Sequence, residues 1–171
     1  MKSGFGDCFA YFCICDQNNN FVAAKLLLEK GADPLILNSS GDLAVCIAAK
    51  LDNVDVLNAI LTDAPDQLNF FNPFKKSLLH ICCEYDLFKC AELLLITYKQ
   101  SVSMRDFYGR IPLLLTVHGE ETESSLKILD LLLKSGSDLF TSDESSRSAS
   151  TICKYLGKKR FLIERFEKLF M

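Results

Sequence analysis

The chain of 171 residues has no tryptophan, only four prolines and two histidines, and no long apolar run. Its longest uninterrupted apolar segment, Cys8 to Cys15, has eight residues, whereas a membrane-spanning helix needs about 20. A secretory signal is not expected either, because the polar residues from Asp16 to Asn20 stand where a small-residue cleavage site would be. We therefore expect no membrane insertion.

An excess of positive charge is also lacking. The 19 Lys and Arg residues are balanced by 22 Asp and Glu residues, for a formal net charge of -3. Nucleic acids and anionic membrane surfaces are bound by concentrated basic faces, so we expect neither as a partner. The hydrophobic content of 49% is enough to offset the entropy of ordering, which argues against disorder. The length fits one globular domain or one short repeat array.

Motifs of catalysis and of cofactor binding are missing as well. The sequence has no HExxH motif, no glycine-rich phosphate loop and no Ser/His/Asp or Cys/His set with supporting spacing. We therefore expect no enzymatic activity, no cofactor and no metal. Eight cysteines in a chain of this length and apolar content are typical of reduced thiols inside the cell. The expected location is the cytoplasm, with the nucleus as the alternative.

A leucine-rich segment repeats along the chain at a nearly constant interval. The steps are 33 residues from Leu28 to Leu61, 34 to Leu95, 38 to Leu133 and 33 to Phe166. Within a unit, apolar residues recur every three or four positions, which predicts amphipathic helices. A period of about 33 residues is typical of stacked helical repeats, in which one unit cannot bury its apolar face alone.

Two motifs recur with this period. The first motif ends a unit. It is found as Gly31-Ala32-Asp33 and as Gly136-Ser137-Asp138, and each copy follows a pair of leucines. A glycine at this place can end a helix because it tolerates positive φ. The second motif begins a unit. It is kept, with substitutions, at Ser77 to Cys83 and at Gly109 to Leu113.

With these motifs, the sequence resembles the ankyrin repeat family over nearly the whole chain. The resemblance implies an all-α solenoid of stacked helix-turn-helix units with finger loops. It also implies a single domain, residues 1–171, with five units at about 1–37, 38–70, 71–104, 105–141 and 142–171.

The long step near the end of the chain places extra residues between Gly119 and Ser125. We expect an acidic surface turn there between the two helices of the fourth unit. The turn is either a solvated length variant or an acidic contact for a basic partner.

Most thiols have a packing explanation. Aligning the units puts Cys15, Ala48, Cys82, Thr116 and Cys153 in one position, where a small side chain packs against the next helix. We expect Cys15, Cys82 and Cys153 to be buried and reduced. A metal site would need Cys13, Cys15, His80, Cys82 and Cys83 to converge from different units, and the paired spacing of a zinc site is missing.

The resemblance implies a structural role for His80, which would hold a finger turn by side-chain to backbone hydrogen bonds. His118 ends the first helix of the fourth unit, and we expect it to be exposed. Since a solenoid presents an extended concave surface, the leading hypothesis is a module that binds a protein or peptide partner. The alternatives are a structural subunit embedded in a larger assembly and, less favoured, a thiol or metal protein.

The two ends of the array differ. The last helix carries Leu162 and Phe166 on one face and looks like a polar cap. The opening helix is apolar around Phe9 and Phe12, so we expect the first unit to contact another chain or residues outside this sequence.

In ankyrin-like arrays the finger turns and the ends of the first helices face the groove. The positions that map there, in order along the chain, are Ser39, Asp42, Lys50, Leu51, Phe74, Lys76, Glu84, Tyr85, Phe107, Tyr108, Arg110, His118, Arg147 and Tyr155. The middle of this set is aromatic and cationic, as interface hot spots often are. Phe74 and Phe107 have an alternative place, folded inward against the fingers.

Overall fold

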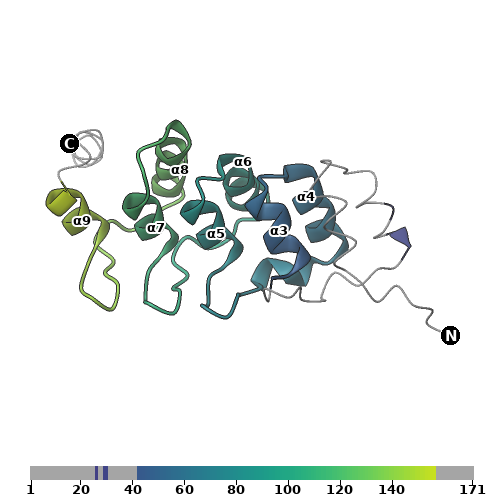
Figure 1. Cartoon of the computed structure of the whole chain (residues 1–171), viewed down its shortest axis with the longest axis horizontal. Helices are drawn as coiled ribbons and strands as arrows, with labels where there is room; N and C mark the ends of the chain where they lie inside the picture. Colours follow the sequence, from purple (N-terminus) through teal and green to yellow (C-terminus); the bar gives the residue numbers. More distant parts are fainter. Residues whose placement is uncertain (1–25, 27–28, 31–41, 157–171) are drawn as a thin grey trace.

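The protein is a row of helix pairs joined by hairpin-like loops, in a computed structural model that describes residues 26, 29–30 and 42–156. The row is elongated, and its loops project from one edge like a comb (Figure 1). The first helices of the pairs are α3 (Ala44–Lys50), α5 (Leu78–Glu84), α7 (Pro112–His118) and α9 (Ala149–Leu156), and the second helices are α4 (Val54–Asp63), α6 (Phe88–Glu92) and α8 (Glu123–Lys134).

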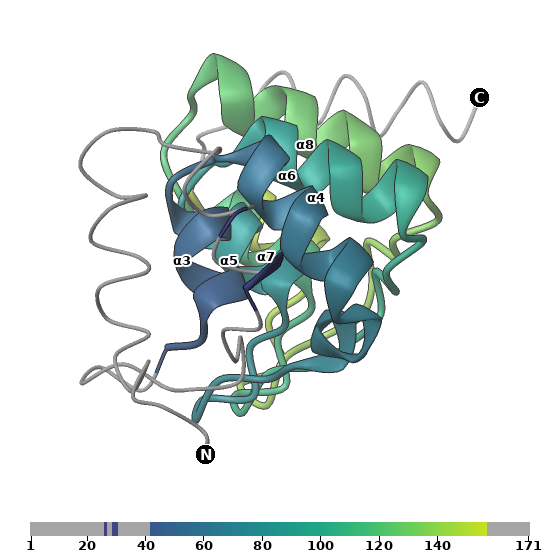
Figure 2. The same cartoon turned by 90° about the vertical axis from the view of Figure 1, so that its right-hand side faces the viewer.

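The helices form two layers. Seen along the row, α3, α5 and α7 stack in one layer and α4, α6 and α8 in the other (Figure 2). A 3-10 helix, η1 (Pro65–Asn69), follows α4, and a π-helical turn, η2 (Leu93–Thr97), continues α6. Over the described part of the chain the only extended pairing is one bridge between Ser142 and Ser148. The predicted all-α solenoid is therefore confirmed.

Four of the described helices begin at residues that suit the free amide groups of a first turn. The Ser77 side chain accepts from His80 N and the Thr122 side chain from Ser125 N, each in a reciprocal capping box. At α4 the Asn53 side chain accepts from Val56 N. At α7, Pro112 occupies the first position, where its missing N–H costs nothing.

The core lies between the two layers and runs continuously along the row. Leu57, Ile60, Leu79, Leu114 and Ile128 are among the fully buried side chains. They come from the second, third and fourth units, so these described units bury their apolar faces against one another. This arrangement explains why the leucine period was visible in the sequence.

The small-residue position also packs as expected. Ala48, Cys82, Thr116 and Cys153 are all buried, which confirms the predicted burial of Cys82 and Cys153. Cys15 falls outside the described residues.

Two predictions about helix ends have different outcomes. Gly136 follows α8 with φ +85°, as predicted for a glycine that ends a helix. The predicted turn from Gly119 to Ser125 is too long, because α8 already begins at Glu123. The cap between Thr122 and Ser125 draws those residues into the helix, so α8 absorbs part of the extra length. Gly31, the apolar opening helix and the last helix lie outside the described residues.

Candidate functional site

Three finger tips share one backbone design. In the turns 72–76, 106–110 and 143–147, the first residue donates its N–H to the carbonyl of the fifth and accepts from the fourth at its own carbonyl, with N···O distances from 2.8 to 3.1 Å. That first residue is Asn72, Asp106 or Asp143. Its Oδ1 also accepts from the backbone N–H groups two and four positions later, at 2.9 to 3.0 Å. The side chain thus takes the place of a further turn of backbone.

The fourth residue of each tip has a left-handed conformation. Lys75, Gly109 and Ser146 have φ of 55°, 71° and 59°. Only glycine adopts this region without cost, so two of the three tips keep a strained residue, and the side-chain hydrogen bonds hold it in place.

Neighbouring fingers are joined through their backbones. Phe107 N donates to the carbonyl of Phe74 at 2.9 Å, and Glu144 N donates to the carbonyl of Tyr108 at 3.1 Å. Arg105 Nη1 reaches two carbonyl oxygens, of Gly109 in its own finger and of Ser142 in the next. The three tips therefore form one connected edge.

His80 fixes a finger from the helix side. Its Nδ1 accepts from Ser77 N at 3.2 Å, and its Nε2 lies 2.9 Å from the carbonyl oxygen of Arg110 in the following unit. These contacts suit a neutral ring with the proton on Nε2. Burial lowers the pKa of His80 below its ordinary value, more than the bond to the Arg110 carbonyl raises it. The structural role expected for His80 is what the geometry shows.

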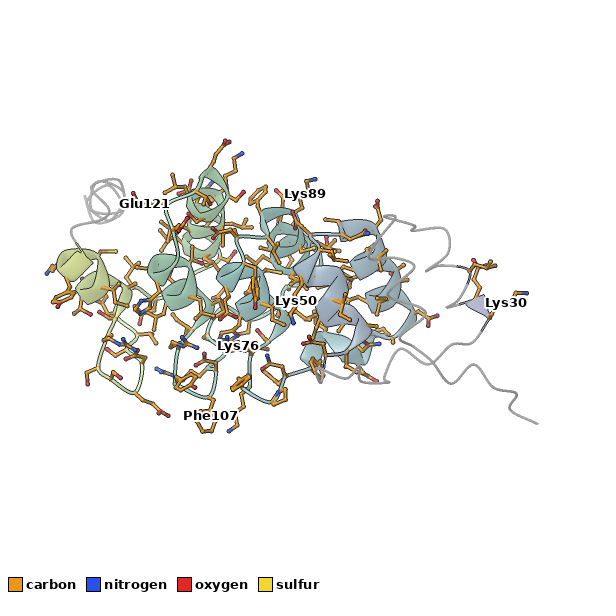
Figure 3. All side chains as sticks on the ribbon, viewed as in Figure 1. Lys30, Lys50, Lys76, Lys89, Phe107 and Glu121 are labelled. Atoms are coloured by element: carbon orange, nitrogen blue, oxygen red, sulfur yellow. The ribbon has the colours of Figure 1, made fainter. Side chains whose placement is uncertain are left out.

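Most apolar side chains predicted for the groove are exposed. Phe74 and Phe107 are 55% and 58% exposed, so the alternative in which they fold inward is wrong. Phe107 lies at the tip of its finger and points away from the helices (Figure 3). The other exposed members of the predicted set are Leu51, Glu84, Tyr85, Tyr108, His118, Arg147 and Tyr155.

Tyr108 is held by two ring contacts. The Phe107 ring meets it edge to face at 5.5 Å between centroids, and the Arg110 guanidinium lies 4.9 Å from its centre. Both geometries are favourable, so these contacts hold the exposed Tyr108 ring in place.

The predicted cations are each paired within the chain. Lys50 contacts Asp42, and Lys76 contacts both carboxylate oxygens of Glu84, with N···O distances of 2.6 Å. Both pairs connect the base of a finger to the end of a first helix. Figure 3 shows Lys76 between its finger and the helices.

In the next two fingers the cation instead turns back to the finger's own aspartate. Arg110 pairs with Asp106 and Arg147 with Asp143, at 2.7 and 2.9 Å. Backbone and guanidinium hydrogen bonds to the Asp143 carboxylate together outweigh burial, so the pKa of Asp143 is lower than usual.

A pocket of about 500 Å³ lies between the end of α7 and α9. Three of the predicted residues meet there, His118, Arg147 and Tyr155, and the remaining described lining is Ser146, Thr151 and Ile152. A second pocket of similar size, lined by Lys99 and Lys134 among others, contains none of the predicted residues.

Comparisons with known proteins agree with this geometry. A family model described as ankyrin repeats in three copies matches residues 11–106, which is more than half of the chain. The chain belongs to the ankyrin repeat family. A crystal structure titled as EF0377, an ankyrin repeat protein, is similar with a TM-score of 0.76 and 26% identity, over 84% of this chain and 73% of that one. No curated protein matches the sequence significantly.

Ankyrin repeats are generally protein–protein interaction modules, and the family is typically non-catalytic. The matched segment ends at residue 106, yet α7, α8 and the finger before α9 continue the same arrangement. Within the portion that the structure describes, no helix is both long and apolar enough to cross a membrane.

The ankyrin motifs of the sequence did not predict the Asn and Asp side chains that hold the finger tips. The signal is an Asn or Asp four residues before a Lys or Arg: Asn72 before Lys76, Asp106 before Arg110, and Asp143 before Arg147. Aligning the units on their fingers rather than on their leucines would have found it.

The thiols of the ankyrin core are poorly suited to chemistry. Burial raises the pKa of Cys46 and Cys83 to about 12, and it raises that of Cys82 and Cys90 as well. A thiol that stays protonated is a weak nucleophile and a weak metal ligand. Among the residues that can be described, no group of three or more His, Cys, Asp or Glu side chains is placed to hold a metal ion.

Proposed function

We propose that the finger edge and the ends of the first helices bind a partner protein or peptide. The residues proposed for contact are Lys50, Leu51, Phe74, Lys76, Tyr85, Phe107, Tyr108, Arg110, His118, Arg147 and Tyr155. The observation that carries the proposal is the exposure of Phe74, Tyr85, Phe107 and Tyr108 on an edge whose backbone is already fixed.

A surface that is already ordered favours binding, because association otherwise costs the conformational entropy of immobilising these side chains. The Asn and Asp side chains fix the tips, and backbone bonds fix each tip to the next. Tyr and Phe then offer a large contact area with few rotatable bonds. Most of the affinity is expected from the third and fourth units, where these aromatics are concentrated.

The four cations contribute differently. Lys50, Lys76, Arg110 and Arg147 are all held by nearby carboxylates and shape the surface, and Arg110 also lies over the ring of Tyr108. We expect them to affect the rate of encounter and the choice of partner more than the affinity.

The test uses captured partner proteins and single variants of the chain. Tyr85→Ala and Tyr108→Ala should each weaken binding by about 1 to 3 kcal/mol with nearly unchanged melting temperature. Ile96→Ala is the matched control, because Ile96 is 52% exposed, close to the 55% of Tyr85, but lies on η2 in the other helix layer. Its affinity should stay at the wild-type level.

The opposite pattern would move the site. Unchanged affinity in both tyrosine variants, with the loss in variants of Glu120 and Glu121, would place binding on the turn before α8. Figure 3 shows Glu121 on the side of the array away from Phe107, so the two sites are separable.

A further inference from the structure

The residue pairs that connect the fingers to the first helices differ between the third and the fifth unit. In the second and third units an ion pair connects the finger base to the end of the first helix, Asp42 to Lys50 and Lys76 to Glu84. The equivalent positions of the next two units hold Arg110 with His118, and Arg147 with Tyr155. Neither of these pairs contains a carboxylate.

Two differences account for the change: positions 118 and 155 at the helix ends hold His and Tyr in place of a carboxylate, and the first residue of the finger becomes an aspartate. That first residue is Asn72 in the third unit, whose neutral side chain leaves Lys76 to reach Glu84. In the last two fingers it is Asp106 or Asp143, and the arginine turns back to it. Each of these arginines is thus held within its own finger, and the pocket is lined by both members of the fifth unit's pair, Arg147 and Tyr155, and by His118 of the fourth unit. Gly119, next to His118, adds no side chain.

The lining has two kinds of chemistry. Ile152 and the ring of Tyr155 make an apolar wall, and Arg147 stands at its edge with 51% of its side chain exposed. The Asp143 carboxylate accepts from Nε of Arg147 and pairs with its Nη2. The Nη1 group of Arg147 can therefore donate to another acceptor. The Asp143 carboxylate is almost fully buried, so it fixes the orientation of the guanidinium from the protein side and leaves the other side of the group exposed. None of the described lining residues is acidic.

We propose that this pocket binds one apolar side chain of a partner peptide, and that an acidic residue next to it in the peptide accepts hydrogen bonds from Arg147 Nη1. A carboxylate is the acceptor that best matches a partly buried, pre-oriented guanidinium. The inference rests on the proposed function, because it names one part of the same groove and the chemistry of its occupant.

The probe is a phage library of short linear peptides, selected on the immobilised full chain. Selected peptides are then synthesised with blocked ends. We expect enrichment of Leu, Ile or Phe beside Asp or Glu. Arg147→Gln should weaken binding about tenfold, as expected for loss of one charge-assisted contact. Replacing the peptide's acid by its amide should give the same loss, and the two losses should not add.

Lys127→Gln is the matched control. Lys127 is 52% exposed and also belongs to an ion pair four residues apart, with Glu123, but it lies on α8 in the other layer. Its affinity should match that of the wild type. Tyr155→Ala should weaken binding several-fold without lowering the melting temperature, because the side chain is 90% exposed.

Several outcomes would overturn the proposal. They are selection of basic or uncharged peptides, an Arg147→Gln loss no larger than that of Lys127→Gln, and failure to select any peptide, which is the result if a second copy or residues 157–171 occupy the pocket. Peptides that depend on Tyr85 and Tyr108 but not on Arg147 would leave the groove function standing and reject the pocket alone.

Discussion

The Nε2 atom of His80 lies 2.9 Å from the carbonyl oxygen of Arg110, 30 residues further along the chain. The same carbonyl accepts the N–H of Asp106 and so closes the finger turn. A buried side chain of one unit therefore sets the shape of the exposed finger of the next. Changes in the core at this point should be felt at the proposed binding edge.

The first prediction concerns the charge state of His80. Its folded-state pKa is lowered, chiefly by burial, so its stabilising contribution is fully present above the unfolded-state pKa of about 6.5. The contribution is lost as the pH falls through the lower folded-state pKa. His80→Gln should cost about 1 to 3 kcal/mol at neutral pH through lost buried hydrogen bonds.

Urea titrations of the wild type and of His80→Gln at several pH values check this. The difference in unfolding free energy should narrow as the pH falls from about 7.5 to about 5. A difference that stays constant over this range would mean that the ring does not titrate as its burial requires.

The second prediction separates the two roles of Asp106. Its Oδ1 accepts two backbone N–H groups, and its Oδ2 accepts from Arg110. Asp106→Ala removes both carboxylate oxygens from a buried position and leaves the part-buried donors of Tyr108 and Arg110 unpaired, at a cost of about 2 to 3 kcal/mol. Asp106→Asn keeps the acceptor, as Asn72 does naturally in the previous finger, and should cost about 1 kcal/mol. Chemical denaturation measures both, and equal losses would show that the turn does not depend on this oxygen.

The helix pairs could be predicted from the sequence because the leucines of each unit repeat both within a helix and from unit to unit. The start of α8 could not be predicted, because the acidic and hydroxyl residues from Glu120 to Ser125 favour a loop by composition. In the structure Thr122 caps the helix, which begins at Glu123. The cap satisfies orphan amide groups and outweighs the composition.

The binding edge was only partly predictable. Exposure of Phe107 and Tyr108 follows from their place in the repeat, and the structure agrees. The pocket depends on two residues together: Asp143, which holds Arg147 within its own finger, and Tyr155, which stands at the helix end where the third unit has Glu84. The period of the leucines carries no information about either position, so an argument from that period could not predict the pocket.

The third prediction concerns thiol reactivity. Cys46, Cys82, Cys83 and Cys90 are buried, and burial raises the pKa of each. At pH about 8 they should react with iodoacetamide far more slowly in the folded chain than in urea, because the thiolate is the reacting form. Mass mapping of the labelled peptides measures each site separately, and rapid labelling of Cys82 in the folded chain would contradict its place in the core.

The fourth prediction concerns the same thiol as a packing group. Cys82→Ala removes one small atom from a position where Ala48 already serves in another unit. The loss in unfolding free energy should be about 1 kcal/mol or less. Thermal melts of the variant and the wild type measure it. A loss of several kcal/mol would show that the sulfur has a role that alanine cannot fill.

The last prediction compares one backbone position in two fingers. Lys75 has φ 55° and Gly109 has φ 71°. A side chain in this region costs about 1 to 2 kcal/mol, and glycine gives back about 0.5 to 1 kcal/mol through its greater freedom when unfolded. Lys75→Gly should therefore stabilise the protein by about 0.5 to 1 kcal/mol, with Lys75→Ala as the control that removes the same charge and keeps the strain. Gly109→Ala should be the most harmful of the three, because its new Cβ would lie 3.1 Å from Glu144 Cγ and 3.2 Å from Glu144 N in the next finger. Differential scanning calorimetry gives the order directly. If Gly109→Ala melts at the wild-type temperature, the left-handed tip and its contact with the next finger are not what holds the edge together.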